Sequence, residues 1–249
     1  TQRVVNATQR AVQGTANALG TTQANINATA TAMGNNAAMA TASSEAATAT
    51  ASAFSDMLTR ATSGKPVLDD PLSDNSGPGK WDEGSPSTNT GCTFQGLYNV
   101  QEATQGYLQP CIAEASNFSD FSYQISLSIT QGYQGRAGLL FHVDSSKKAF
   151  YFFHIGTDNT YALDLYQGTG KVDTLSRGLS YTISAGLNQS NQLAVIAHDT
   201  TYDLFINGGY VASVTDGTLG AGKVGVAVID NGTPVTAQFS DAKVWQGRS

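Results

Sequence analysis

The N-terminal part of the chain repeats an apolar position every seven residues. In rows of seven starting at Val4, the second column holds mostly large apolar residues, and the fifth holds mostly Thr, Ser and Asn. This spacing is typical of an apolar stripe along a helix, because a strand would alternate every second residue. We expect the following stripe residues to mediate assembly: Val5, Val12, Leu19, Ile26, Met33 and Phe54.

Such a helix needs a partner. Gly14, Gly20 and Gly34 each cost up to ~1 kcal/mol relative to Ala, and an isolated helix with one thin stripe is marginal. We therefore expect it to pack against copies of itself or against a neighbouring subunit's folded domain. Two other interpretations are a glycosylated low-complexity linker and a transit peptide, although the segment has few arginines for the latter.

The second part of the chain alternates with a period of two. Phe121, Tyr123, Ile125, Leu127 and Ile129 are separated by Ser and Gln, which predicts a strand with one buried face. Further short strands are predicted at 138–143, 150–155, 161–166, 181–183, 193–197, 202–206, 210–214, 224–229 and 237–245. This pattern predicts a mainly β fold, a jelly-roll β-sandwich preceded by a long α-helical heptad segment.

Composition supports the same division. All six prolines follow the heptad segment, and the chain becomes rich in Pro, Gly and Ser directly after it. We therefore predict a helix over residues 1–62, a connector over 63–90 and a sandwich over 91–249.

Asn207, Gly208 and Gly209 predict a hairpin turn between two of the strands, because these residues tolerate positive φ.

Charge and cysteine content restrict the partners. The net charge is −6 and Lys and Arg form no cluster, so the sequence argues against a nucleic-acid binder. No stretch approaches the ~20 apolar residues of a membrane span. Cys92 and Cys111 lack the additional Cys or His residues of a zinc site, which favours a disulfide and an extracellular or cell-surface location.

Five N-glycosylation sequons are compatible with secretion, although Asn- and Thr-rich chains also produce them by chance. The acceptor residues are Asn6, Asn27, Asn117, Asn188 and Asn231.

The second part resembles a known family. The segments VLDDPLSD, FSDFSYQISLSI, GRAGLLFHV and AFYFFHIGTDNTYALDLY, followed by FINGGY, GKVGVAV and a final-strand Trp, are similar to concanavalin A-like (LamG or laminarinase-like) jelly-roll modules of bacterial extracellular proteins. The resemblance covers about residues 67–245. It is greatest to modules of the Chloroflexi type, which follow Ala/Thr-rich stalks. It implies the fold but not the function, because the family includes hydrolases, lectins and spacers.

The catalytic pattern of the family's hydrolases is missing. Those enzymes use two glutamates on one strand, whereas the four glutamates of this chain all lie at or before residue 114. We therefore predict no enzyme activity, no catalytic residue and no metal site, and expect His142, His154 and His198 to be hydrogen-bonded sheet residues. By resemblance to lectin-like sandwiches, a structural calcium ion is considered at four carboxylates: Asp69, Asp70, Asp74 and Asp241.

Two functions remain open. The heptad segment favours an extracellular structural subunit that assembles with its copies into a filament or fibril and displays a non-catalytic jelly roll. The alternative is a stalked carbohydrate-binding or adhesion module. The candidate glycan contacts are Trp81 and Tyr133. Tyr98, Tyr166 and Tyr210 are further aromatic candidates, whereas Trp245 is expected in the core.

Overall fold

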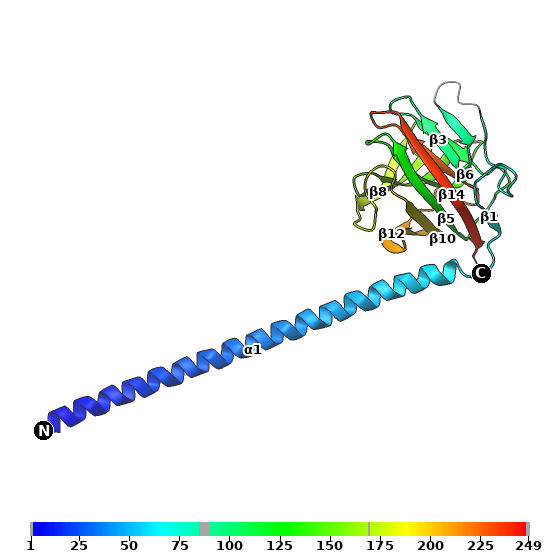
Figure 1. Ribbon diagram of the computed structural model, residues 1–249. Helices are drawn as coiled ribbons and strands as arrows, with labels where there is room; N and C mark the ends of the chain where they lie inside the picture. Colours follow the sequence, from blue (N-terminus) through cyan, green and yellow to red (C-terminus); the bar gives the residue numbers. More distant parts are fainter. Residues whose placement is uncertain (1, 85–89, 169, 248–249) are drawn as a thin grey trace. The chain divides into compact units, whose positions relative to one another are not determined.

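The computed structural model describes residues 2–84, 90–168 and 170–247, and the side chains of these residues except 2–9 and 47. They form one long helix and a β-sandwich (Figure 1), which confirms the predicted fold class. The chain divides into two units, Thr1–Ser52 and Ala53–Ser249.

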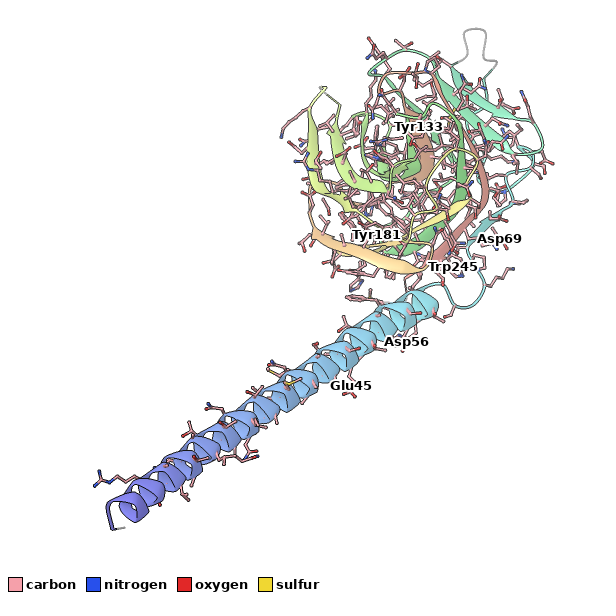
Figure 2. All side chains as sticks on the ribbon, turned by 60° about the vertical axis from the view of Figure 1, so that its left-hand side comes forward. Glu45, Asp56, Asp69, Tyr133, Tyr181 and Trp245 are labelled. Atoms are coloured by element: carbon pink, nitrogen blue, oxygen red, sulfur yellow. A yellow bond between two sulfur atoms is a disulfide. The ribbon has the colours of Figure 1, made fainter. Side chains whose placement is uncertain are left out.

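Helix α1 (Gln2–Ala61) contains 60 residues and is about 90 Å long. All described side chains from residue 10 to 52 are exposed, and the acidic side chains Glu45 and Asp56 point into solvent (Figure 2). Many Thr hydroxyls donate to the carbonyl oxygen four residues earlier, as from Thr15 to Ala11 at 3.0 Å. These hydroxyls are therefore satisfied within the helix.

The last turns of α1 belong to the second unit. Phe54 is half-buried and stacks on Tyr210, with ring centroids 3.7 Å apart and an interplanar angle of 5°. Met57 and Leu58 are also half-buried. Part of the Phe54 ring therefore packs within its own chain, and its role in assembly stays a prediction.

Within the described residues, the strands form two antiparallel sheets. The eight-stranded sheet contains, in spatial order, β12 (Gly209–Thr215), β11 (Thr201–Ile206), β10 (Asn191–His198), β5 (Phe121–Gln131), β14 (Val235–Gln246), β3 (Tyr98–Glu102) and β2 (Gly91–Phe94), and β1 (Leu68–Asp70) pairs with β14. The six-stranded sheet contains β4 (Leu108–Ile112), β13 (Lys223–Ile229), β6 (Arg136–Asp144), β7 (Ala149–Gly156), β8 (Thr160–Gln167) and β9 (Val172–Leu179). Figure 1 shows β5 beside β14, near the middle of the larger sheet.

Inward-facing side chains from both sheets form the core. The alternating apolar residues of β5 are all buried, as predicted. Trp245 is 8% exposed, but it pairs with Ser122 on the outer face of the larger sheet, where its indole Nε1 donates to the carbonyl of Gly64 at 3.2 Å. Cys92 on β2 and Cys111 on β4 form the predicted disulfide, with Cα atoms 6.1 Å apart. This bond joins the two sheets, and closing a loop of this length contributes about 3 kcal/mol in the chain-entropy description.

One strand prediction is wrong, and five strands, β1 to β4 and β9, were not predicted. Residues 181–183 form turns, and Tyr181 is 91% exposed. The strand that pairs with β8 is instead β9, which the sequence pattern did not predict because this edge strand carries few buried apolar residues. The predicted hairpin turn is confirmed, since Asn207 and Gly208 have φ angles of 51° and 79°.

His142 also differs from expectation. It is 2% exposed, and neither of its ring nitrogens has a hydrogen-bond partner among the described residues. Instead, the rings of Phe121, Phe141, Tyr151 and Tyr202 surround it with centroids 5.4–6.0 Å away. Burial lowers the pKa of His142 from 6.5 to about 4, against the opposing charge of Asp120.

We expect this histidine to make the fold acid-sensitive. Because its pKa is lower in the folded chain than in the unfolded chain, the unfolded state binds more protons between pH 6.5 and 4. His142 should thus remove about 3 kcal/mol of stability as the pH falls through this range. Denaturant unfolding of the wild type and of His142→Gln across this range measures the effect. The variant should lose clearly less stability on acidification, and parallel curves would contradict the assignment.

Candidate functional site

The outer face of the six-stranded sheet, the face turned away from the other sheet, carries the candidate site. On β7, Tyr151, Phe153 and Ile155 point into the core, so Phe152 and His154 lie on the outer face. Outer-face side chains such as Leu140, Phe150 and Phe152 are buried, although no further layer of strands or helices covers them among the described residues. This face is therefore a hollowed surface.

Strand register places four outer residues in one row across the sheet. Gly138 on β6 pairs with His154, which pairs with Ala162 on β8, which pairs with Arg177 on β9. We call these four residues the cleft row. Ala162 adds little bulk between His154 and Arg177, so space remains above it.

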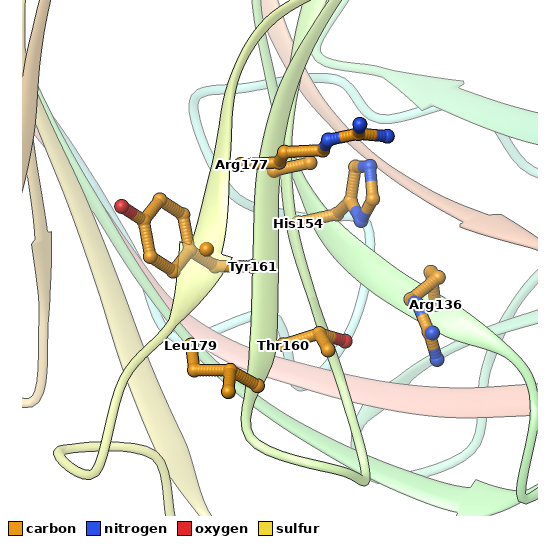
Figure 3. Close-up of a pocket in the computed structure, with 8 residues that line it drawn as sticks. Arg136, His154, Thr160, Tyr161, Arg177 and Leu179 are labelled. Atoms are coloured by element: carbon orange, nitrogen blue, oxygen red, sulfur yellow. The ribbon is translucent and has the colours of Figure 1, made fainter.

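That space is part of a cleft of about 440 Å³. It is lined by Arg136, His154, Thr160, Tyr161, Ala162, Arg177, Gly178 and Leu179. Figure 3 shows the side chains of His154, Arg177 and Arg136 projecting to the same side of the sheet, whereas Tyr161 projects to the other side. The Tyr161 hydroxyl donates to the carbonyl of Val211 on β12 at 3.1 Å, which fixes that ring between the two sheets.

A hydrogen-bonded group of side chains borders the cleft. His154 Nε2 lies 2.9 Å from Asp164 Oδ2, and the Thr174 hydroxyl donates to Asp164 Oδ1 at 2.7 Å. Burial opposes ionisation of Asp164, but the hydrogen bonds and positive charge of His154, the bond from Thr174 and the charge of Arg177 outweigh it. The pKa of this carboxyl group is therefore lowered, and it is a charged acceptor at neutral pH.

Arg136 is held in place on the opposite side of the cleft. Its Nη2 lies 3.3 Å from Asp158 Oδ2, and Nη1 donates to the carbonyls of Gln134 and Gly135 at 3.3 Å each. The guanidinium lies over Gly156, where an added Cβ would approach Nη1 to 2.4 Å. The absence of a side chain at Gly156 thus allows Arg136 to lie across β7.

A second cleft of about 530 Å³ lies on the same sheet. It is lined by Asp82, Leu108, Pro110, Ile112, Glu114, Val143, Ser145, Lys148, Phe150 and Tyr166. Phe150 and Tyr166 stack with centroids 4.8 Å apart, and burial with the nearby charge of Asp164 raises the pKa of Tyr166 to about 12. Burial also raises the pKa of Asp82, whose Oδ2 accepts the Ile112 amide at 3.0 Å.

Trp81 is not a glycan platform, contrary to our prediction. It is 2% exposed, and its indole Nε1 donates to Asp70 Oδ2 at 3.1 Å. Asp70 is itself buried and also accepts the amide of Leu72 at 3.0 Å. Trp81 therefore anchors the segment before β2 to the sandwich.

Tyr133, the other predicted contact, is 64% exposed. It lies in the β5–β6 loop, next to the two carbonyls that bind Arg136, and its own carbonyl accepts the Thr157 hydroxyl at 2.6 Å. The loop that carries Tyr133 is thus tied to strand ends beside the cleft. Its role in binding stays a prediction.

The structure does not bring the candidate calcium ligands together. Asp70 binds Trp81, Asp74 accepts the Ser76 amide at 2.8 Å, Asp69 lies 4.0 Å from Lys243 and Asp241 accepts the Ser240 hydroxyl at 3.1 Å. The residues that the structure describes contain no group of three or more metal-ligand side chains. The acidic residues serve local structure in this chain.

The remaining predicted residues fall on the surface. Asn27, Asn117, Asn188 and Asn231 are exposed, as a glycosylation acceptor must be, whereas the side chains of Asn6 and Val5 lie outside the described residues. His142 faces the core and His154 faces the cleft, so these two histidines do not form a pair. His198 is exposed, near Asp120 and Asp199.

Sequence reasoning missed four site residues, namely Arg136, Thr160, Asp164 and Arg177. Asp164 lies within a strand that was predicted, at an alternate position to the buried Leu163 and Leu165. Its outer-face location could have been derived from period two. Arg177 could not, because β9 itself was not predicted.

Comparison with solved structures supports the fold. The chain is similar to carbohydrate binding module CBM66 from Bacillus subtilis (17% identity, 59% of this chain and 85% of that chain, TM-score 0.51). It is also similar to a Bacillus subtilis protein of unknown function with a galectin-like fold (15% identity, 74% and 96% covered, TM-score 0.56). A third similar structure is the Bacillus licheniformis beta-glucanase (10% identity, 75% and 100% covered, TM-score 0.53).

These likenesses are consistent with a concanavalin A-like sandwich, a fold shared by enzymes and non-enzymes. Neither the protein families nor the curated proteins that were compared with the chain gave a match. The resemblance to stalked Chloroflexi modules therefore stays a prediction. Helix α1 lacks the apolar stretch of a membrane span, and the described residues offer no other helix that has one.

Proposed function

We propose that this chain is an extracellular, non-catalytic carbohydrate-binding or adhesion module, and that it binds sugar in the cleft above Ala162, between His154 and Arg177. The observation that carries the proposal is the arrangement of donors and acceptors around this small-residue floor. Arg136 and Arg177 supply donors, and the Thr160 hydroxyl, whose proton is donated to Asp158, can accept from a ligand. Sugar hydroxyls both donate and accept, so such a mixed lining suits them.

The similar solved structures also support this proposal through their fold. One similar structure is described as a carbohydrate binding module and another as having a galectin-like fold. A fold alone does not decide function, so the proposal depends on the cleft itself. The disulfide between Cys92 and Cys111 is compatible with an extracellular location.

Hydrolysis is the less favoured use of this fold. None of the four glutamates lies on strands β6 to β9, which form the cleft. Glu114, in the second cleft, is ion-paired with Lys223, and Asp82 beside it accepts a backbone amide. Both carboxylates thus have structural partners, and we propose no catalytic residue.

Filling the cleft should weaken sugar binding. Ala162→Met adds bulk to the floor without removing a charged or hydrogen-bonding side chain, so glycan affinity should fall roughly tenfold or more. Ser128→Met, on the outer face of the other sheet, is the matched control and should bind like the wild type. A glycan array followed by titration calorimetry measures both. Equal binding by the two variants would contradict the proposed location, and no glycan binding by the wild type would contradict the function.

Self-assembly through α1 is retained as a second candidate. The stripe residues Val12, Leu19, Ile26 and Met33 are 56–67% exposed. Two shallow hollows lie along the stripe, one lined by Val12, Thr15, Ala16 and Leu19 with Ala11, and the other by Ile26, Thr29, Ala30 and Met33 with Thr22 and Asn25. Both contain residues spaced i, i+3, i+4 and i+7, the four-residue hole that receives a side chain in coiled coils.

Two further features suit a second copy of the helix. The hydroxyls of Thr15, Thr22 and Thr29 are bonded to backbone carbonyls, so these side chains can enter an apolar seam without leaving a donor unpaired. Charge is almost absent between residues 10 and 52, where only Arg10 and Glu45 are ionised. Copies therefore would not repel each other, although nothing in the charge pattern fixes their register.

Breaking the stripe should reduce association. Leu19→Ser together with Ile26→Ser removes two large apolar residues, and the full chain should shift from an oligomer to a monomer in sedimentation velocity and lose helical circular dichroism. Ala24→Ser with Thr31→Ser alters the opposite helix face and should leave the oligomer intact. A wild type that stays monomeric at all concentrations would contradict this candidate.

A further inference from the structure

The arginines of the sandwich gather at one site, whereas the six lysines between residues 68 and 247 do not line it. Between residues 68 and 247 the sequence contains only two arginines, Arg136 and Arg177, in a chain whose net charge is −6. Both line the 440 Å³ cleft, together with His154. They come from β6 and β9, which are separated by β7 and β8, so the strand order brings them to one site.

The two arginines differ in how they are held. Arg136 has its ion pair with Asp158, and its side chain is 21% exposed. Arg177 is exposed, has no hydrogen bond, and lies more than 4.0 Å from any carboxylate oxygen in the part of the chain that the structure describes. Its planar guanidinium therefore keeps its N–H donors available.

The negative group beside the cleft does not use the donors of Arg177. Asp164 contributes charge close to Arg177, but its two oxygens accept bonds from His154 and Thr174. The Asp164 carboxylate is thus committed to its own strand neighbours, β7 and β9. A ligand anion would find Arg177 free and Arg136 already oriented on the other side of the floor.

We infer that the cleft selects an anionic sugar, with Arg177 binding the carboxylate of a uronic acid residue. This inference rests on the proposed function and names the chemical class of its ligand. The guanidinium fork matches a carboxylate in a bidentate geometry, which a neutral sugar hydroxyl cannot reproduce. Arg136 and Thr160 then contact the hydroxyl groups of the same sugar or its neighbour.

The test compares acidic sugars with their neutral forms. Galacturonate and alginate oligosaccharides, each with its methyl-esterified counterpart, are titrated into the full chain at low salt. The wild type should bind at least one free acid roughly tenfold more tightly than its ester, as a charge-assisted bond predicts, and the preference should decline as salt is added.

Variants assign the preference to one side chain. Arg177→Gln should bind the acid and the ester equally, and Arg177→Lys should recover part of the preference because it restores the charge without the fork. Lys243→Gln on β14 removes the same charge from the other sheet and should behave like the wild type.

The outcomes separate the inference from the function it rests on. Equal affinity of the wild type for acid and ester, with binding lost in Ala162→Met, overturns the inference and leaves the proposed function standing. A preference for the acid that survives Arg177→Gln overturns the role of Arg177. If the wild type binds neither the free acid nor the methyl ester of either oligosaccharide, the inference is overturned. The glycan array then decides whether the chain binds neutral sugars.

Discussion

The register of strands β6 to β9 is the constraint from which the proposed site follows. Pairing of Gly138 with His154, of His154 with Ala162 and of Ala162 with Arg177 puts the cleft row on one face of the sheet. A shift of one residue in any strand would exchange its outer and inner side chains. The apolar core beneath, with Phe153 and Leu163 fully buried, therefore fixes the position of the polar residues above it.

Much of this architecture can be predicted from residue patterns. The alternation along β5 and the Asn207-Gly208 turn predict their structures because local geometry decides them. The heptad stripe predicts α1 for the same reason. Cys92 and Cys111 could be paired because no competing cysteine exists.

The failures share a physical cause, namely dependence on contacts distant in sequence. Trp81 looks like a surface aromatic residue until Asp70 provides a buried acceptor for its indole. The stacking of Phe54 on Tyr210 likewise could not be derived from the heptad repeat. Strand β9 is an edge strand whose pairing with β8, not its own composition, determines its conformation. The site residue Arg177 was missed with it.

The two parts of the chain suggest complementary roles. A shallow, open cleft that forms a few hydrogen bonds is expected to bind a sugar weakly. If copies associate through the exposed stripe, several clefts would act together, and linked sites gain avidity without any new contact. Assembly and sugar binding, which began as competing hypotheses, would then serve one function.

The most direct test of the central claim is amide chemical-shift mapping of the isotope-labelled full chain with an oligosaccharide that it binds. The account predicts that the largest perturbations fall on Gly138, His154, Ala162 and Arg177, with smaller ones along the rest of β6 to β9. Perturbations centred on the eight-stranded sheet, such as on Ser126 and Ser128, would contradict it.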